Sequence, residues 1–146
     1  MRRLIAATLV ASAAFVTGAT TGVAYAGSAY SATGYFSVAG RNYSNDAGIH
    51  TNHVNNHRAH ASTGIDHSGG NLPSGYMGAL PMRRNSSGAL LCQGTYYYND
   101  GPASGISNVG CFINNHSTYS SKGATRAWNG SGYNSYWTFL SPNQNS

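Results

Sequence analysis

The strongest constraint on the fold of this 146-residue chain is the scarcity of helix-forming residues after residue 26. The chain has no Glu and few Leu, Lys and Gln, whereas Tyr, Thr, Gly and Asn are abundant. Such a composition favours strands and turns over helices. Apolar side chains also alternate with period two, as Phe36 and Val38 do, which is typical of strands with one buried face. The chain is therefore predicted to be all-β.

Two turn sequences predict how some of the strands are joined. The sequence RNSSGA at 84–89 connects residues 76–83 to residues 89–98, and WNGSGY at 128–133 connects residues 121–128 to residues 133–140. The second turn contains an Asn-Gly pair, which favours positive φ.

The same alternation gives a prediction of the core and of the architecture. It assigns Tyr96, Tyr98, Trp137 and Phe139 to the core, and Pro81 predicts an edge or a bulge in its strand. Six to eight short strands predict a small antiparallel β-sandwich, with a small β-barrel as the alternative.

The two ends of the chain and its two cysteines indicate an extracellular protein. Residues 1–26 have a basic start, an apolar segment and a final Ala24-Tyr25-Ala26, which predicts a signal peptide cleaved before Gly27. The apolar segment is too short for a membrane span, and no C-terminal anchor is visible. Residues 27–146 then form one secreted domain, in which Cys92 and Cys111 are predicted to form a disulfide.

The charge of the mature domain argues against nucleic acid as a partner. Without residues 1–26, six Lys and Arg remain against three Asp, giving a formal charge of +3 that is scattered along the chain. Nucleic-acid-binding domains are more basic, and their charges cluster. The oligomeric state is left open by the sequence.

Four histidines at positions 50, 53, 57 and 60 have spacings of three, four and three. On a helix, His50, His53, His57 and His60 would lie on one face and could bind Zn²⁺ or Cu²⁺. The segment is a poor helix, and a hairpin turning at Asn55-Asn56 is the competing prediction. That hairpin pairs His50 with Ala61 and divides the histidines between two faces. A third reading is an exposed polar segment, which becomes cationic in mildly acidic surroundings and attracts anionic polymers.

Catalytic signatures are scarce, and the aromatic residues offer a different kind of site. Only Asp46, Asp66 and Asp100 supply carboxylates, and no G-x-S-x-G elbow is present, so a small hydrolase is the minor alternative. Exposed Tyr and Trp beside Asn, Ser and Gly suit a surface that stacks on sugar rings or contacts a protein. Tyr97, Trp128 and Tyr136 are the candidates for that surface.

Segments 75–99 (GYMGALPMRRNSSGALLCQGTYYYN) and 127–142 (AWNGSGYNSYWTFLSP), with a second Cys between them, resemble a group of small secreted actinomycete proteins. The resemblance covers most of residues 35–142, excludes the histidine block and implies no activity. Together these features predict a secreted, non-enzymatic module that binds cell-wall glycan, another extracellular polymer or a protein. A metal-binding protein that uses the histidines is the alternative.

Overall fold

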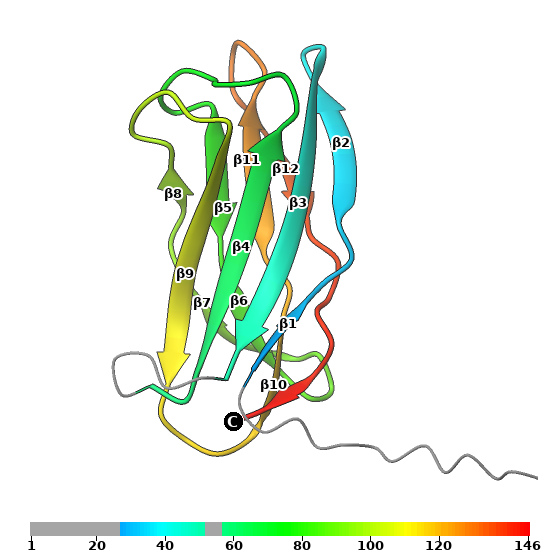
Figure 1. The fold of residues 1–146 in the computed structure, drawn as a ribbon, viewed down its shortest axis with the longest axis vertical. Coiled ribbons are helices and arrows are strands. Elements are labelled where there is room, and N and C mark those ends of the chain that lie inside the picture. Colours follow the sequence, from blue (N-terminus) through cyan, green and yellow to red (C-terminus); the bar gives the residue numbers. More distant parts are fainter. Residues whose placement is uncertain (1–26, 52–56) are drawn as a thin grey trace, which may run out of the picture.

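The computed structural model describes residues 27–51 and 57–146. Within these ranges every regular element is a β-strand, thirteen in all, and the strands pack as two antiparallel layers (Figure 1). The predicted all-β sandwich is confirmed. No helix in the described ranges is long and apolar enough to cross a membrane. The predicted signal peptide at 1–26 and the turn at Asn55-Asn56 lie outside the described residues.

One layer, which we name the front sheet, is built on two long paired strands. These are β3 (Arg41–His50) and β4 (Ala59–His67), and β9 (Gly105–Ile113) continues the sheet beyond β4. On the other side, β1 (Ser28–Tyr30) and β2 (Gly34–Val38) pair with successive parts of β3. Alternation along the strands gives this sheet an inner face toward the other layer and an outer face toward solvent.

The other layer, which we name the back layer, consists of two four-stranded sheets placed end to end. Their orders are β13-β10-β6-β7 and β12-β11-β5-β8. The strands are β5 (Met77–Leu80), β6 (Met82–Asn85), β7 (Leu90–Gln93), β8 (Tyr97–Tyr98), β10 (Thr118–Ser121), β11 (Ala124–Trp128), β12 (Tyr133–Trp137) and β13 (Gln144–Asn145). All three sheets keep free edges and are not closed into a barrel, so the barrel alternative is wrong.

Pro81 divides the back layer, and the prediction that it lies at an edge or a bulge is wrong. It is fully buried between β5 and β6, each of which has a paired strand on both sides. Because proline has no N–H to donate, the ladder is interrupted there, and the strands before and after it belong to different sheets. The predicted strand at 89–98 is divided in the same way, since its backbone meets Pro81 at Gly94, whose N–H donates to the Pro81 carbonyl at 2.9 Å.

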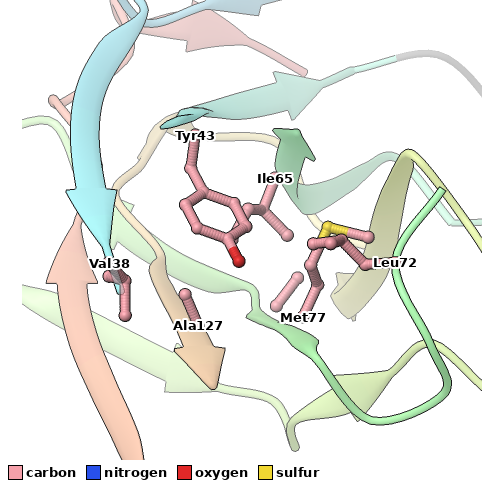
Figure 2. Close-up of a cluster of buried hydrophobic side chains, with 7 residues drawn as sticks. Val38, Tyr43, Ile65, Leu72, Met77 and Ala127 are labelled. Carbon is pink, nitrogen blue, oxygen red and sulfur yellow. The ribbon is translucent and has the colours of Figure 1, made fainter. Parts of the chain in front are cut away.

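The main core lies between the layers. Seven buried side chains meet there, six of them labelled in Figure 2: Val38, Tyr43, Ile65, Leu72, Met77, Ala79 and Ala127. Aromatic stacking extends this core, because the Phe36 ring lies 4.0 Å from Tyr136 and 5.5 Å from Tyr43, measured between centroids. This stack joins β12 in the back layer to β2 and β3 in the front sheet.

The predicted disulfide is confirmed, and it ties the two layers together. Cys92 lies on β7 and Cys111 on β9, with their Cα atoms 5.6 Å apart. A β-bulge in β9 makes the bond feasible: Ala59 pairs with Ile113 and Ala61 with Gly110, so Cys111 and Phe112 together face one residue of β4. Cys111 has a positive φ of 58°, and it is buried although strict alternation would turn it outward.

Both predicted hairpins are confirmed. The turn after Asn85 joins β6 to β7, and the turn after Asn129 joins β11 to β12. In each turn the asparagine side-chain oxygen accepts backbone N–H groups, as from Ser131 and Gly132 at 2.9 Å each. Gly130 takes a φ of 107°, which its Asn-Gly position predicted.

A close approach of the two layers at Gly123 gives a test of this packing. A Cβ at Gly123 would lie 1.8 Å from Thr63 Oγ1 and 2.7 Å from the Leu80 carbonyl oxygen. We expect Gly123→Ala to lower the free energy of unfolding by about 1–3 kcal/mol, as overpacking does, measured by urea denaturation. Gly132→Ala is the control, because a Cβ there meets nothing within 4 Å. Equal stability of the two variants would contradict the close contact.

Candidate functional site

Five aromatic side chains lie on the outer surface of the sheet β12-β11-β5-β8, of which Tyr133 and Trp137 are exposed and the other three are half-buried. Ala127 of β11 is buried in the core, so its neighbours Arg126 and Trp128 turn outward. Cross-strand pairing then places Tyr133 beside Trp128, and Trp137 beside Ala124. We call this surface the aromatic face. It consists of Tyr96, Tyr98, Arg126, Trp128, Tyr133 and Trp137.

Arg126 holds the centre of the aromatic face. Its guanidinium carbon lies 4.0 Å from the centroid of the Tyr96 ring, a cation–π distance. Its Nη1 donates to the Tyr98 hydroxyl at 2.8 Å, and its Nε donates to Ser135 Oγ at 3.3 Å. The hydrogen bond to Tyr98 raises the pKa of Arg126, so the guanidinium stays charged. The cation is thus fixed in position while remaining close to solvent.

The rings around Arg126 are also held in place by their neighbours. Tyr98 lies over Gly78, where a Cβ would come within 2.7 Å of the ring. Tyr133 contacts Tyr98 at 5.0 Å and Trp128 at 5.2 Å between centroids, and its hydroxyl donates to the Gly75 carbonyl at 2.7 Å. Trp137 stands more freely and is 61% exposed. A surface of fixed rings loses little conformational entropy when a ligand binds.

Of the three predicted contact residues, only Trp128 belongs to the aromatic face. Tyr97 is exposed, but it pairs with the buried Ala79 and so lies on the opposite side of β8 from Tyr98. Tyr136 is wrongly predicted as a surface residue, because it stacks on Phe36 between the layers. The reason is the pairing of β12 with β11: Ser135 lies opposite the outward Arg126, so Tyr136, its neighbour, turns inward.

Four further aromatic residues are wrongly predicted to lie in the core. Trp137 and Phe139 were predicted in the core, but they are 61% and 57% exposed. Tyr96 and Tyr98 were also predicted in the core and lie on the outer surface, packed against Arg126. A signal for this was present: the polar Arg126 alternates with Ala127, and the turn at 129–132 fixes which residues of β12 lie opposite them.

His50 and His60 lie on the other side of the molecule, on the outer face of the front sheet. The predicted pairing of His50 with Ala61 is wrong by one residue, because His50 pairs with His60 and Ile49 with Ala61. Burial of the apolar Ile49 and Ala61 in the interior accounts for this register. The consequence is that His50 and His60 share one face, where their rings stack at 4.7 Å with an interplanar angle of 17°.

The neighbours of this histidine pair fix its position. Ser28 Oγ lies 2.7 Å from Nδ1 of His50, and Ser62 Oγ lies 2.7 Å from Nε2, so both ring nitrogens are hydrogen-bonded. Phe112, turned outward by the bulge in β9, contacts the rings of His57 and His60. His50 thereby fastens β1 and β4 to β3.

This arrangement bears on the predicted metal site. Both nitrogens of His50 are occupied by serines, so His50 would have to give up a hydrogen bond to bind a metal. Nδ1 of His57 and Nδ1 of His60 are buried with no hydrogen-bond partner. Within residues 27–51 and 57–146 no group of three or more His, Cys, Asp or Glu is placed as metal ligands. His53 lies outside the described residues.

A second feature of the front sheet is an open hollow of about 250 Å³ beside Tyr35, Ser44, Asp66 and His67. Burial, aided by the nearby Asp46, raises the pKa of Asp66. His67 Nδ1 donates to the Gly70 carbonyl at 2.8 Å. The hydrogen bonds of the His50 ring run to serines and not to a carboxylate, so they do not form a Ser-His-Asp series.

The stacked histidines predict a pH dependence of stability. Burial lowers the pKa of His50 and of His60 from 6.5, and at His60 the charges of His50 and His57 lower it further. The unfolded chain then binds more protons than the folded chain once the pH falls below about 6.5, so stability is greatest above this pH and falls below it. We expect a lower urea midpoint at pH 5.5 than at pH 7.5.

The control for this prediction is the double variant His50→Gln/His60→Gln. It lacks the two titrating rings and should show a smaller difference between the two pH values, whatever its absolute stability. The histidine explanation fails if the double variant loses as much stability between pH 7.5 and pH 5.5 as the parent.

Comparison of the chain with protein-family models, with curated proteins and with solved structures found no match.

Proposed function

We propose that the protein is a non-enzymatic extracellular module that binds a glycan polymer through its aromatic face. The observation that carries the proposal is the grouping of five aromatic side chains around one fixed arginine on a single outward surface. Tyr and Trp offer large flat apolar surfaces with a polar group at the edge, which suits the apolar faces and hydroxyl rims of sugar rings.

The form of the surface supports a polymer rather than a small ligand in a cavity. The rings come from β8, β11 and β12 and from Tyr96 just before β8, so they extend across one sheet instead of surrounding a pocket. Ser135 of β12 lies among them and adds a small hydroxyl group that can hydrogen-bond to sugars. Such a surface can contact several successive sugar units.

The extracellular setting is part of the same proposal. The Cys92–Cys111 disulfide supports it, since disulfides persist in oxidising compartments. The signal peptide predicted at 1–26 and the resemblance to small secreted proteins agree with it. The target is then a polymer of a cell surface or of the surrounding medium.

Removal of single rings tests the proposal. Trp137→Ala removes a ring that is 61% exposed, so the fold should be unaffected. Trp128→Ala removes the ring that contacts Tyr133. We expect each variant to lose about tenfold or more in affinity for the polymer identified by a glycan array and by pull-down with insoluble polysaccharides.

The matched control is Tyr97→Ala, because Tyr97 is 42% exposed but lies on the other side of β8. It should bind like the parent protein. Thermal unfolding of all variants verifies that the fold is intact. Failure of the parent to bind any glycan, or equal loss of binding in the Tyr97 variant, would refute the aromatic face as a glycan site.

A second candidate function is metal binding at the histidines, as their spacing predicted. The observation that favours it is the pair of unpartnered, buried Nδ1 atoms on His57 and His60. Neutral imidazole is a good ligand for Zn²⁺ and Cu²⁺. We expect a calorimetric titration of untagged protein to show binding that His57→Ala/His60→Ala abolishes; equal weak binding in both proteins would exclude the site.

A further inference from the structure

We propose that the ligand of the aromatic face is an acidic polysaccharide, a polymer of sugars that carry carboxylates, and that Arg126 binds one of these carboxylates. This inference rests on the proposed function and specifies its ligand. It follows from the donors that Arg126 leaves open, from the charges around it and from the positions of the rings beside it.

Arg126 has unused donors in a fixed geometry. A guanidinium carries five N–H groups in a planar fork that matches the two oxygens of a carboxylate. Within the described part of the chain, the partners of this guanidinium are the Tyr98 hydroxyl at Nη1 and the Ser135 hydroxyl at Nε. Its remaining donors, including both on Nη2, form no such hydrogen bond within the described residues, and Arg126 is partly exposed. Stacking on Tyr96 already holds the fork in position, so binding costs little side-chain entropy.

The charges of this sheet complement an anion. Strands β5, β8, β11 and β12 contain no Asp or Glu. Lys122, just before β11, places its ammonium 5.9 Å from the centroid of the Trp137 ring and adds a second positive charge. Asp46 and Asp66 lie on the front sheet, in the opposite layer. The third carboxylate, Asp100, is exposed in the loop two residues after β8. A carboxylate that approaches Arg126 therefore meets two cations, and no anion comes from the four strands of this sheet.

The small number of cations on the aromatic face favours a ligand with sparse charges over a densely charged polymer such as a nucleic acid. Nucleic-acid sites use clusters or stripes of Lys and Arg. The aromatic face instead presents one central guanidinium among five rings, with Lys122 at one side. One cation beside several aromatic rings of the protein suits a polymer in which each sugar ring carries a single carboxylate.

The positions of the rings allow both contacts at once. The Tyr98 ring lies beside the Arg126 guanidinium, which donates a hydrogen bond to its hydroxyl. The Tyr133 ring lies next to it, with the two centroids 5.0 Å apart. A sugar ring seated on these tyrosines brings a carboxylate at its edge within reach of Nη2. The neighbouring sugar units then extend over Trp128 or toward Trp137.

The test compares three polymers by isothermal titration calorimetry. Polygalacturonate carries sugar rings and carboxylates, its fully methyl-esterified form carries the same rings without the charge, and polyglutamate carries carboxylates without sugar rings. We expect the protein to bind polygalacturonate at least about tenfold more tightly than either of the others, since a charge-assisted hydrogen bond to a guanidinium is stronger than one between neutral groups.

Variants assign the carboxylate to Arg126. Arg126→Gln should reduce the affinity for polygalacturonate by about tenfold or more and leave the methyl ester unaffected. Arg126→Lys keeps the charge but lacks the planar fork, so it should recover only part of the affinity. Arg58→Gln, a substitution of a cation that neighbours His116 near β9, is the control and should bind like the parent.

Each outcome decides the inference. Equal binding of polygalacturonate and its methyl ester by the parent protein overturns it, while the proposed glycan site stands. Equal binding of polyglutamate also overturns it, in favour of an acidic protein partner. If polygalacturonate does not bind but a neutral glycan does, the inference fails alone. If no glycan binds at all, the inference and the proposed function fail together.

Discussion

The contact between the two layers at β9 is the constraint on which the rest of the structure depends. The bulge in β9 turns Cys111 inward to Cys92, and the buried Arg83 donates from Nε to the Cys111 carbonyl at 3.0 Å. Arg83 also lies 4.6 Å from the centroid of the Tyr119 ring, which helps to offset the cost of burying its charge. With the layers joined in this way, the outer faces of both layers are turned to solvent, and they carry the aromatic face and the stacked His50 and His60.

Glycine has the same role on both outer faces. Gly78 leaves room for the Tyr98 ring, Gly48 leaves room for His50 and Tyr30, and Gly64 leaves room for the Asp46 carboxylate. A residue without a side chain at a cross-strand position lets a neighbouring side chain lie flat against the sheet. On each outer face a polar side chain is also held by two hydroxyl groups, Arg126 by Tyr98 and Ser135, and His50 by Ser28 and Ser62.

The sequence predicts correctly the features that depend on neighbouring residues. It does not predict which face of a strand is buried or which residues pair across two strands. The hairpins at Asn85 and Asn129 follow from turn residues, and the disulfide follows from the number of cysteines. The positions of Tyr136 and Trp137 were exchanged, because both faces of β12 carry aromatic residues and hydrophobicity alone cannot choose between them. A solvent-facing aromatic surface therefore looks like a core in the sequence.

The sequence by itself determined the all-β class, the turns and the pairing of Cys92 with Cys111, since these depend on propensity, turn chemistry and cysteine count. Only the tertiary structure decided that Arg126 lies among five rings and that His50 stacks on His60. The physical reason is that a shift of one residue in a strand exchanges its two faces. Which face is buried is settled by packing against the opposite layer, through contacts between residues far apart in the chain.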